Sequence, residues 1–154
     1  MASLLTLTQS QPVRRLAAGD YLIEAGEAGG ELFVLEAGRL VVLREGVEIA
    51  VIDEPGALIG EMSVLLGVDH SASVRAEQPS SVRVIEDAIP FLERSPLIAL
   101  EVATLACQRL EATSALVVEL RRELAAEPAH QGLITRIFSS LAGPPPRSGR
   151  ALAD

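Results

Sequence analysis

ELFVLEAGRLVVLREGVEIAVIDEPG, residues 31–56, contains three strand-like runs, and each run ends at a glycine. The runs ELFVLEAG, RLVVLREG and VEIAVIDEPG are rich in Val, Ile, Leu and Phe and recur about eight to twelve residues apart. This spacing between turn signals is typical of an all-β sandwich or barrel. Gly46 separates the second run from the third, so the segment REGVEIA predicts a β-hairpin.

Similar runs lie on both sides of this stretch. YLIEA precedes it at residues 21–25, and SASVRAE and SSVRVIE follow it as far as residue 86, with a turn at Gln78-Pro79. Glycines are frequent up to Gly67 and then absent until Gly132, which indicates a change of architecture. We therefore expect a mostly β fold with C-terminal helices, and 154 residues of 49% hydrophobic content suffice for one domain with an appendage.

Residues 97–126 contain neither Gly nor Pro and are rich in Ala, Leu, Glu and Arg, so they predict one long helix. Six of its residues alternate in steps of four and three and lie along one narrow seam: Ala106, Leu110, Thr113, Val117, Leu120 and Leu124. Such a seam indicates a partner helix. Either two copies of the chain pair in a parallel homodimer, or the seam packs on the chain's own β domain.

The C-terminal part divides into two pieces. Residues 130–141, HQGLITRIFSSL, predict a short amphipathic helix, and AGPPPRSGRALAD, which is rich in Pro and Gly, predicts a flexible tail. The expected organisation is a β domain over residues 1–92, the long helix over residues 93–126, and the amphipathic helix with the tail over residues 127–154.

The charge of the chain excludes several classes of function. The net charge is −8 and all 13 basic residues are Arg, so a direct contact with nucleic acid is not expected, nor is chemistry that needs a lysine. With the single cysteine Cys107 no intrachain disulfide can form. No signal peptide or membrane span is recognisable, so we expect a cytoplasmic location and no membrane contact.

Catalytic and metal-binding patterns are also missing. The two histidines, His70 and His130, lie in different halves of the chain, too few and too far apart for a metal site of the cupin type. Neither lies in a recognisable nucleophile motif. We expect no enzyme, no metal and no cofactor.

The segment GEMSVLLGVDHSASVRA, residues 60–76, carries the most specific signal. Gly60 precedes EMSVLL, which can form one helical turn whose free amides attract an anion. Glu61 would repel a phosphate but could accept hydrogen bonds from sugar hydroxyls. Ser71 at the other end could donate a hydrogen bond to a phosphate oxygen.

The order of these features resembles the cyclic-nucleotide-binding domain family, and within it the sensor domain of catabolite activators. The resemblance covers about residues 12–122 and rests on residues 17–42, on EPGALIGEMSVL and on the returning strand SASVRA. It implies an eight-stranded jelly-roll barrel, a double-stranded β-helix, with a phosphate-binding cassette and a helix that closes the pocket. The implied ligand residues of the cassette are Gly60, Glu61, Met62, Ser63, His70, Ser71 and Ala72.

The long helix extends the resemblance through RLEATSALVVEL. Thr113 and Ser114 match a Thr-Ser pair that binds adenine in the family, one residue from each subunit of a dimer. Arg109 matches an arginine that braces the ribose-binding glutamate, so the resemblance implies an ion pair between Arg109 and Glu61. The implied ligand is therefore cAMP or a related small nucleotide.

His70 departs from the family pattern, because cyclic-nucleotide binders usually carry an arginine there. An arginine makes two parallel hydrogen bonds to a phosphate, whereas a histidine, with an ordinary pKa of about 6.5, carries little charge at neutral pH. Asp69 beside it adds negative charge. Three hypotheses remain: a sensor with weaker, pH-sensitive binding; a pocket for a different small ligand; or a degenerate barrel used for dimerisation or protein docking.

The output of such a sensor is limited by the sequence that follows the long helix. About 30 residues remain after this helix, and they end in the tail of Pro and Gly residues, so no helix-turn-helix fits. A signal would then pass through the C-terminal helices to an unidentified protein partner.

Overall fold

The computed structural model describes residues 3–125, 132 and 136. The chain divides into two compact units, Met1–Cys107 and Gln108–Asp154. The predicted amphipathic helix and tail at residues 127–154 lie outside the described residues, except for Gly132 and Arg136, which are helical.

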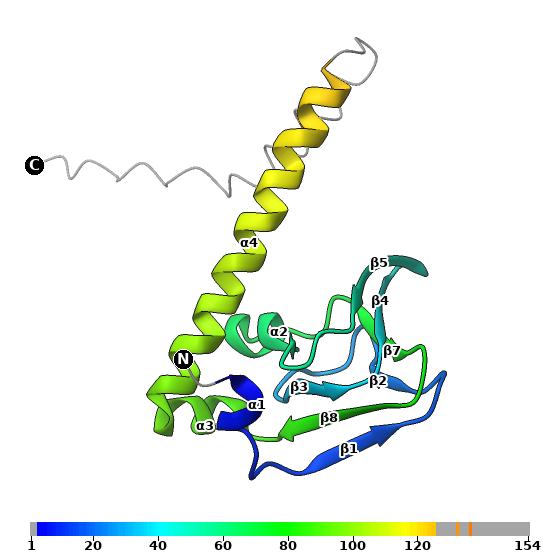
Figure 1. The fold of residues 1–154 in the computed structure, drawn as a ribbon. Coiled ribbons are helices and arrows are strands. Elements are labelled where there is room, and N and C mark those ends of the chain that lie inside the picture. The colour runs from blue at the N-terminus through cyan, green and yellow to red at the C-terminus, as the bar shows by residue number, and fades with distance from the viewer. Residues whose placement is uncertain (1–2, 126–131, 133–135, 137–154) are drawn as a thin grey trace, which may run out of the picture. The chain divides into compact units, whose positions relative to one another are not determined.

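The first unit contains the β structure that the sequence predicts (Figure 1). After the short helix α1 (Leu4–Leu7), its described strands are β1 (Val13–Leu16), β2 (Tyr21–Ile23), β3 (Leu32–Ala37), β4 (Leu40–Arg44), β5 (Val47–Ile52), β6 (Leu58–Ile59), β7 (Ser73–Ala76) and β8 (Ser80–Ile85). The helices are α2 (Glu61–Leu66), between β6 and β7, then α3 (Ala88–Arg94) and α4 (Pro96–Leu124).

These strands form two four-stranded antiparallel sheets. One sheet has the order β1-β8-β3-β6 and the other the order β2-β7-β4-β5. Consecutive strands therefore alternate between the sheets except at the β4–β5 hairpin, which is the connectivity of a jelly roll. The prediction of a mostly β, eight-stranded jelly roll followed by helices is confirmed.

The hairpin predicted around Gly46 is present. Arg44 of β4 pairs with Val47 of β5, which leaves a two-residue turn at Glu45 and Gly46. Both turn residues have positive φ, 52° and 78°, as a turn of type I′ requires. The glycine in REGVEIA thus supplies the backbone conformation that reverses the chain.

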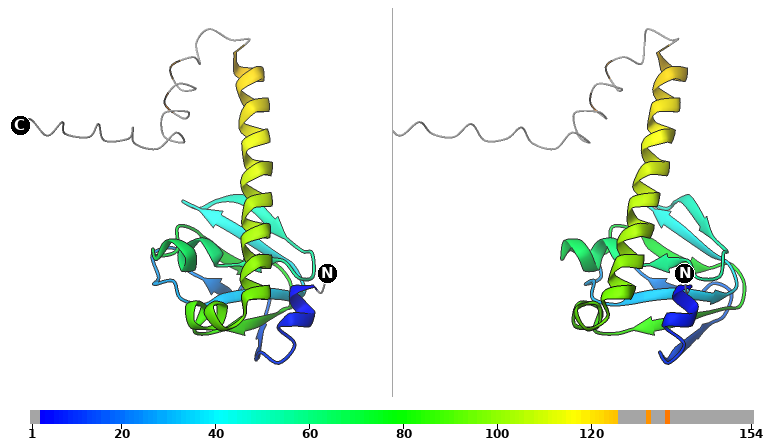
Figure 2. Two further views of the ribbon diagram at one scale, coloured as in Figure 1. Left: turned by 90° about the vertical axis from the view of Figure 1, so that its left-hand side faces the viewer. Right: turned by 60° about the vertical axis from the view of Figure 1, so that its left-hand side comes forward.

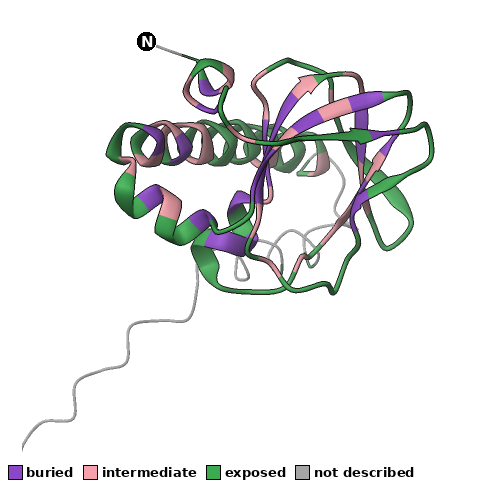
Figure 3. Ribbon diagram, turned by 90° about the horizontal axis from the view of Figure 1, so that it is seen from below, coloured by how far each residue is buried: buried purple, intermediate pink, exposed green. Residues whose placement is uncertain are grey.

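Strand β3 contributes to two separate hydrophobic clusters because its side chains alternate between the two faces of its sheet. Phe33 and Leu35 belong to the cluster between the sheets. Leu32 and Val34 point the other way and pack with residues of the helices, including Ile98 of α4. In Figure 3 the buried residues of the strands and of the helices beside them are drawn in purple. The second cluster attaches the helices of the first unit to the outer face of this sheet.

Two helices follow the last strand, and Pro96 in the segment DAIPFLERSPL marks the boundary between them. α3 ends at Arg94, and Pro96 occupies the first position of α4, where its missing N–H costs no hydrogen bond. In both views of Figure 2, α1 and α3 lie beside the first turns of α4. Ile98 and Val102 of those turns are buried. The long helix predicted from the absence of Gly and Pro over residues 97–126 is present as α4, Pro96–Leu124. Residues 93 and 94, which the expected organisation placed in it, belong instead to α3.

Candidate functional site

The cassette begins with Gly60, which joins β6 to α2 in a left-handed conformation with φ 89° and ψ 1°. A Cβ on residue 60 would stand 2.8 Å from the backbone carbonyl oxygen of Glu31. Only glycine fits both the backbone angle and the space. Helix α2 begins at the next residue, and its first amides have no acceptor within their own helix.

Helix α2 has a buried face and an exposed face. Glu61, Ser63 and Val64 are buried, and Val64 packs in the cluster under the helices. Met62, which the resemblance places among the ligand residues, is 60% exposed. The helix ends at Gly67, whose left-handed conformation lets the chain turn back toward β7.

A second glycine packs directly against α2. A Cβ on Gly29 would collide with the Cβ of Ser63 and would stand 2.9 Å from the carbonyl oxygen of Val68. The backbone between β2 and β3 therefore packs against α2 at Ser63 and against the residue that follows Gly67. Sequence reasoning missed this support, although the signal is present as three glycines in the five residues GEAGG.

His70 is fixed at its backbone and at its ring. Its backbone N–H donates to the carbonyl of Glu27 at 2.9 Å, and its carbonyl accepts from the N–H of Gly26 at 2.8 Å. Its ring Nδ1 lies 2.9 Å from Ser63 Oγ. The half-buried imidazole is thus held beside the first turn of α2, and two of the residues implied by the resemblance are in direct contact.

The remaining cassette residues lead into β7. Ser71 is exposed and Ala72 is half-buried. The next hydroxyl, on Ser73, accepts a hydrogen bond from the backbone N–H of Ala25 at 2.9 Å, a second link to the turn after β2 that the sequence did not reveal. The structure therefore places residues 60–63 next to residues 70–72, and both segments lie against the turn between β2 and β3.

The three implied ligand residues of α4 belong to the second compact unit. Arg109, Thr113 and Ser114 are exposed on this helix. Both Arg109 and Glu61 have interaction partners in the structure. The predicted ion pair between these two residues, and the contact of Thr113 and Ser114 with an adenine, stay predictions.

Carboxylates dominate the charge near the cassette. They are Glu61 on α2, Asp69 on the loop to β7, and Glu24, Glu27 and Glu31 around the turn between β2 and β3. Of these, Glu31 forms an ion pair with Arg14 at 3.5 Å, and Glu61 is the most buried, with an exposed fraction of 5%. An anion bound here needs hydrogen-bond donors that offset this negative field.

Two further features were looked for in the described part of the chain: a metal site and a membrane-spanning helix. Within residues 3–125, 132 and 136, no three His, Cys, Asp or Glu side chains are grouped as a metal site would require. None of the helices over the same residues is long and apolar enough to cross a membrane.

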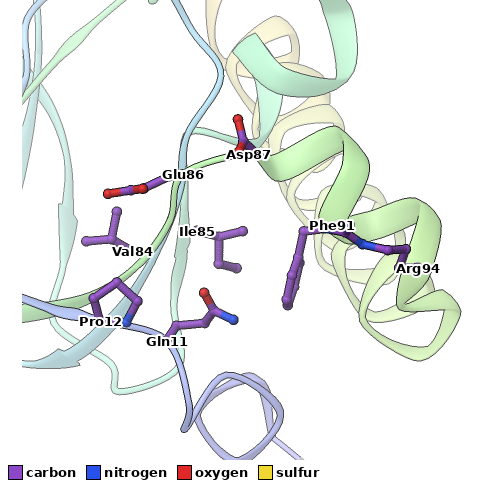
Figure 4. A pocket seen from close by; sticks show the side chains of 8 residues that line it. All are labelled: Gln11, Pro12, Val84, Ile85, Glu86, Asp87, Phe91 and Arg94. Carbon is purple, nitrogen blue, oxygen red and sulfur yellow. The ribbon is translucent and has the colours of Figure 1, made fainter.

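A separate cavity of about 270 Å³ lies where β8 leads into α3. Figure 4 shows Ile85, Gln11 and the ring of Phe91 around its middle, with Glu86 and Arg94 on opposite sides. It shares no residue with the cassette. Its charged groups do not converge on one point, so the cavity suggests no particular ligand.

Comparison with known proteins identifies the class of domain. A family model described as the cyclic nucleotide-binding domain matches residues 13–88. The cGMP-dependent protein kinase, isozyme 1, of Drosophila melanogaster is 35% identical over an alignment 112 residues long, and the match covers 60% of this chain and 14% of that kinase. The chain therefore matches only a small part of that relative.

Solved structures agree on the fold. The catabolite activator protein of Thermus thermophilus has a TM-score of 0.65 at 22% identity, over 90% of this chain and 82% of the activator. The N-terminal domain of a transcriptional regulator from Streptomyces coelicolor A3(2) has a TM-score of 0.53 at 29% identity, over 70% of this chain and 81% of that domain.

Proposed function

Residues 13–88 of this chain belong to the cyclic nucleotide-binding domain family, and from this premise we propose that the chain is a non-catalytic, cytoplasmic sensor that binds cAMP or a related cyclic nucleotide. The ligand's phosphate would lie in the cassette formed by residues 60–63 and 70–72. The observation that carries this proposal is the fixed imidazole of His70, which lies 2.9 Å from Ser63 Oγ in the first turn of α2.

The phosphate of a cyclic nucleotide is a diester with a single negative charge. The amides at the start of α2 and the Ser71 hydroxyl can donate hydrogen bonds to its oxygens. His70 adds a third kind of donor, which becomes a cation when the imidazole is protonated. A charged hydrogen bond is roughly twice as strong as a neutral one, so binding should be tighter at low pH.

Glu61 supports a sugar-binding role in this proposal. It is almost fully buried in the cassette. A buried carboxylate is an acceptor only, so it repels a phosphate but accepts hydrogen bonds from the hydroxyl groups of a ribose. Glu61 would therefore bind the 2′-hydroxyl of the ribose and favour ribonucleotides.

Two observations bear on which base the site prefers. Thr113 and Ser114 match the residues that bind adenine in catabolite activators, which favours cAMP. The Drosophila relative, however, is named a cGMP-dependent kinase. Both nucleotides must therefore be compared.

A homodimer is part of the proposal because of the seam along α4. Leu110 is 68% exposed and Leu120 is 48% exposed, whereas burying a leucine contributes about 1.5–3 kcal/mol. The heptad-like spacing from Ala106 to Leu124 fits a second copy of the same helix. An unidentified protein would then read a ligand-induced change in these helices.

Two measurements test this function. Calorimetric titration of the purified protein with cAMP and cGMP at pH 6 should show binding. A higher affinity for cAMP than for cGMP would support the adenine assignment. Native mass spectrometry of the protein as purified would detect another small molecule in its place. No heat with either nucleotide at millimolar concentration would contradict the proposed sensor. A copurified molecule would then favour a pocket for a different small ligand.

A further inference from the structure

Ser63 and His70 form a pair whose proton positions can be worked out from burial. Ser63 is only 6% exposed, so its hydroxyl proton needs a protein acceptor. The hydrogen-bond partner observed for Ser63 Oγ is His70 Nδ1 at 2.9 Å. If Nδ1 carried the proton and donated to Ser63, the buried hydroxyl proton would lack this acceptor. The neutral pair is therefore satisfied when Ser63 donates to an unprotonated Nδ1.

We propose that Ser63 is a positioning residue that holds neutral His70 in the tautomer with its proton on Nε2. The ring nitrogen that hydrogen-bonds to a neighbour determines which nitrogen keeps the proton. His70 then presents an N–H donor to the ligand even when it carries no charge. The ligand part of this inference rests on the proposed binding of a cyclic nucleotide, whereas the tautomer does not.

The backbone contacts keep the ring in place for this role. The N–H and the carbonyl of His70 both bond to the turn at residues 26–27. The ring atom Cε1, which lies between the two ring nitrogens, is 3.8 Å from the point where a Cβ of Gly60 would stand. One ring edge therefore faces the start of the cassette, with Nδ1 already bonded to Ser63 and Nε2 left as the donor.

The surrounding charges make a neutral donor valuable. The acidic groups on the elements around His70 are Asp69 on its own segment, Glu61 on α2, and Glu24, Glu27 and Glu31 on the neighbouring turn. A cation also lies nearby, because the Arg14 guanidinium of β1 forms an ion pair with Glu31 at 3.5 Å. The carboxylates outnumber it. Because a phosphate in this negative field depends on donors at every pH, a fixed Nε2–H would maintain part of the binding above the pH range in which imidazole is protonated.

Nitrogen NMR of the imidazole tests the tautomer without any ligand. At pH 8, ¹⁵N-labelled protein should show His70 with an unprotonated Nδ1 and a protonated Nε2, and Ser63→Ala should lose this strong preference. The His130→Gln variant removes the other histidine and assigns the signals. A protonated Nδ1 in the unaltered protein, or the same tautomer mixture with and without the Ser63 hydroxyl, would overturn the inference.

Binding measurements test its consequence. Ser63→Ala should lower the affinity for cAMP about threefold to tenfold at pH 8, because the His70 side chain is then no longer preorganised for binding. The loss should be smaller at pH 6, because both nitrogens of a protonated imidazole donate and the tautomer no longer matters. A loss of equal size at the two pH values would indicate a merely structural role and contradict the proposal.

Ser73→Ala is the matched control, because it removes another serine hydroxyl that bonds near the cassette without touching His70. It should not change the ratio of the affinities at pH 6 and pH 8. If no variant binds cAMP at either pH, the proposed function fails, while the NMR result still decides whether Ser63 fixes the tautomer.

Discussion

A Cβ on Gly60 would stand 2.8 Å from the carbonyl oxygen of Glu31, so the backbone of the β2–β3 segment leaves no room for a side chain at the start of the cassette. Gly60→Ala should therefore destabilise the protein through two effects: left-handed backbone strain of about 1–2 kcal/mol and a clash of about 1–3 kcal/mol. Denaturant-induced unfolding measures the sum.

Gly56→Ala separates the two effects. Gly56 has nearly the same φ as Gly60, 92° against 89°, but no atom lies within 4 Å of its added Cβ. This control should carry only the backbone strain. Equal losses of stability in the two variants would show that the contact with Glu31 does not constrain the cassette.

His70→Arg should raise the affinity for cAMP at least tenfold, because a guanidinium keeps its charge at every accessible pH and can bind a phosphate through two parallel hydrogen bonds. The variant should also bind equally well at pH 6 and pH 8. Calorimetry measures both quantities. An unchanged affinity would mean that the cassette differs from a phosphate site in more than this one side chain.

Glu61→Gln should reduce discrimination at the sugar. The unaltered protein should bind cAMP more tightly than 2′-deoxy-cAMP, by about tenfold, since a hydrogen bond to a charged group is worth about 1.5–3 kcal/mol. The amide is nearly the same size but lacks the charge, so the preference should shrink to a few-fold. Competition between the two nucleotides checks this. If the Glu61→Gln variant keeps the full preference for cAMP over 2′-deoxy-cAMP, Glu61 does not bind the ribose.

Leu120→Glu should dissociate the proposed homodimer, because a carboxylate at the seam would be buried without a partner. Ala115→Glu adds the same charge to an exposed position of α4 outside the seam and should leave the dimer intact. Sedimentation velocity distinguishes the two species. If the Leu120 variant sediments like the unaltered protein, the seam is not the dimer contact.

Much of the fold could be predicted because its signals are local. Gly46 between two apolar runs defined the β4–β5 hairpin, and its positive φ is the reason a glycine stands there. The absence of Gly and Pro after Pro96 defined α4. Gly60 marked the start of the cassette because the left-handed turn it makes is a property of one residue.

The contacts that fix the cassette could not be predicted in the same way. Gly29 and Ser63 are far apart in the sequence, and so are Ala25 and Ser73, yet each pair is in contact. Such contacts depend on how the jelly roll brings the β2–β3 turn against α2, which a local pattern does not encode. The sequence therefore revealed His70 as a departure from the family but not its bond to Ser63.

The most direct test of the central claim is the affinity of the unaltered protein for cAMP at pH 6 and at pH 8. Raising the pH removes the charge of a protonated imidazole and leaves the neutral Nε2–H donor. We predict binding at both values, tighter at pH 6 by roughly threefold to tenfold, because a charged hydrogen bond is the stronger one. Absence of binding, or an affinity independent of pH, would contradict the account.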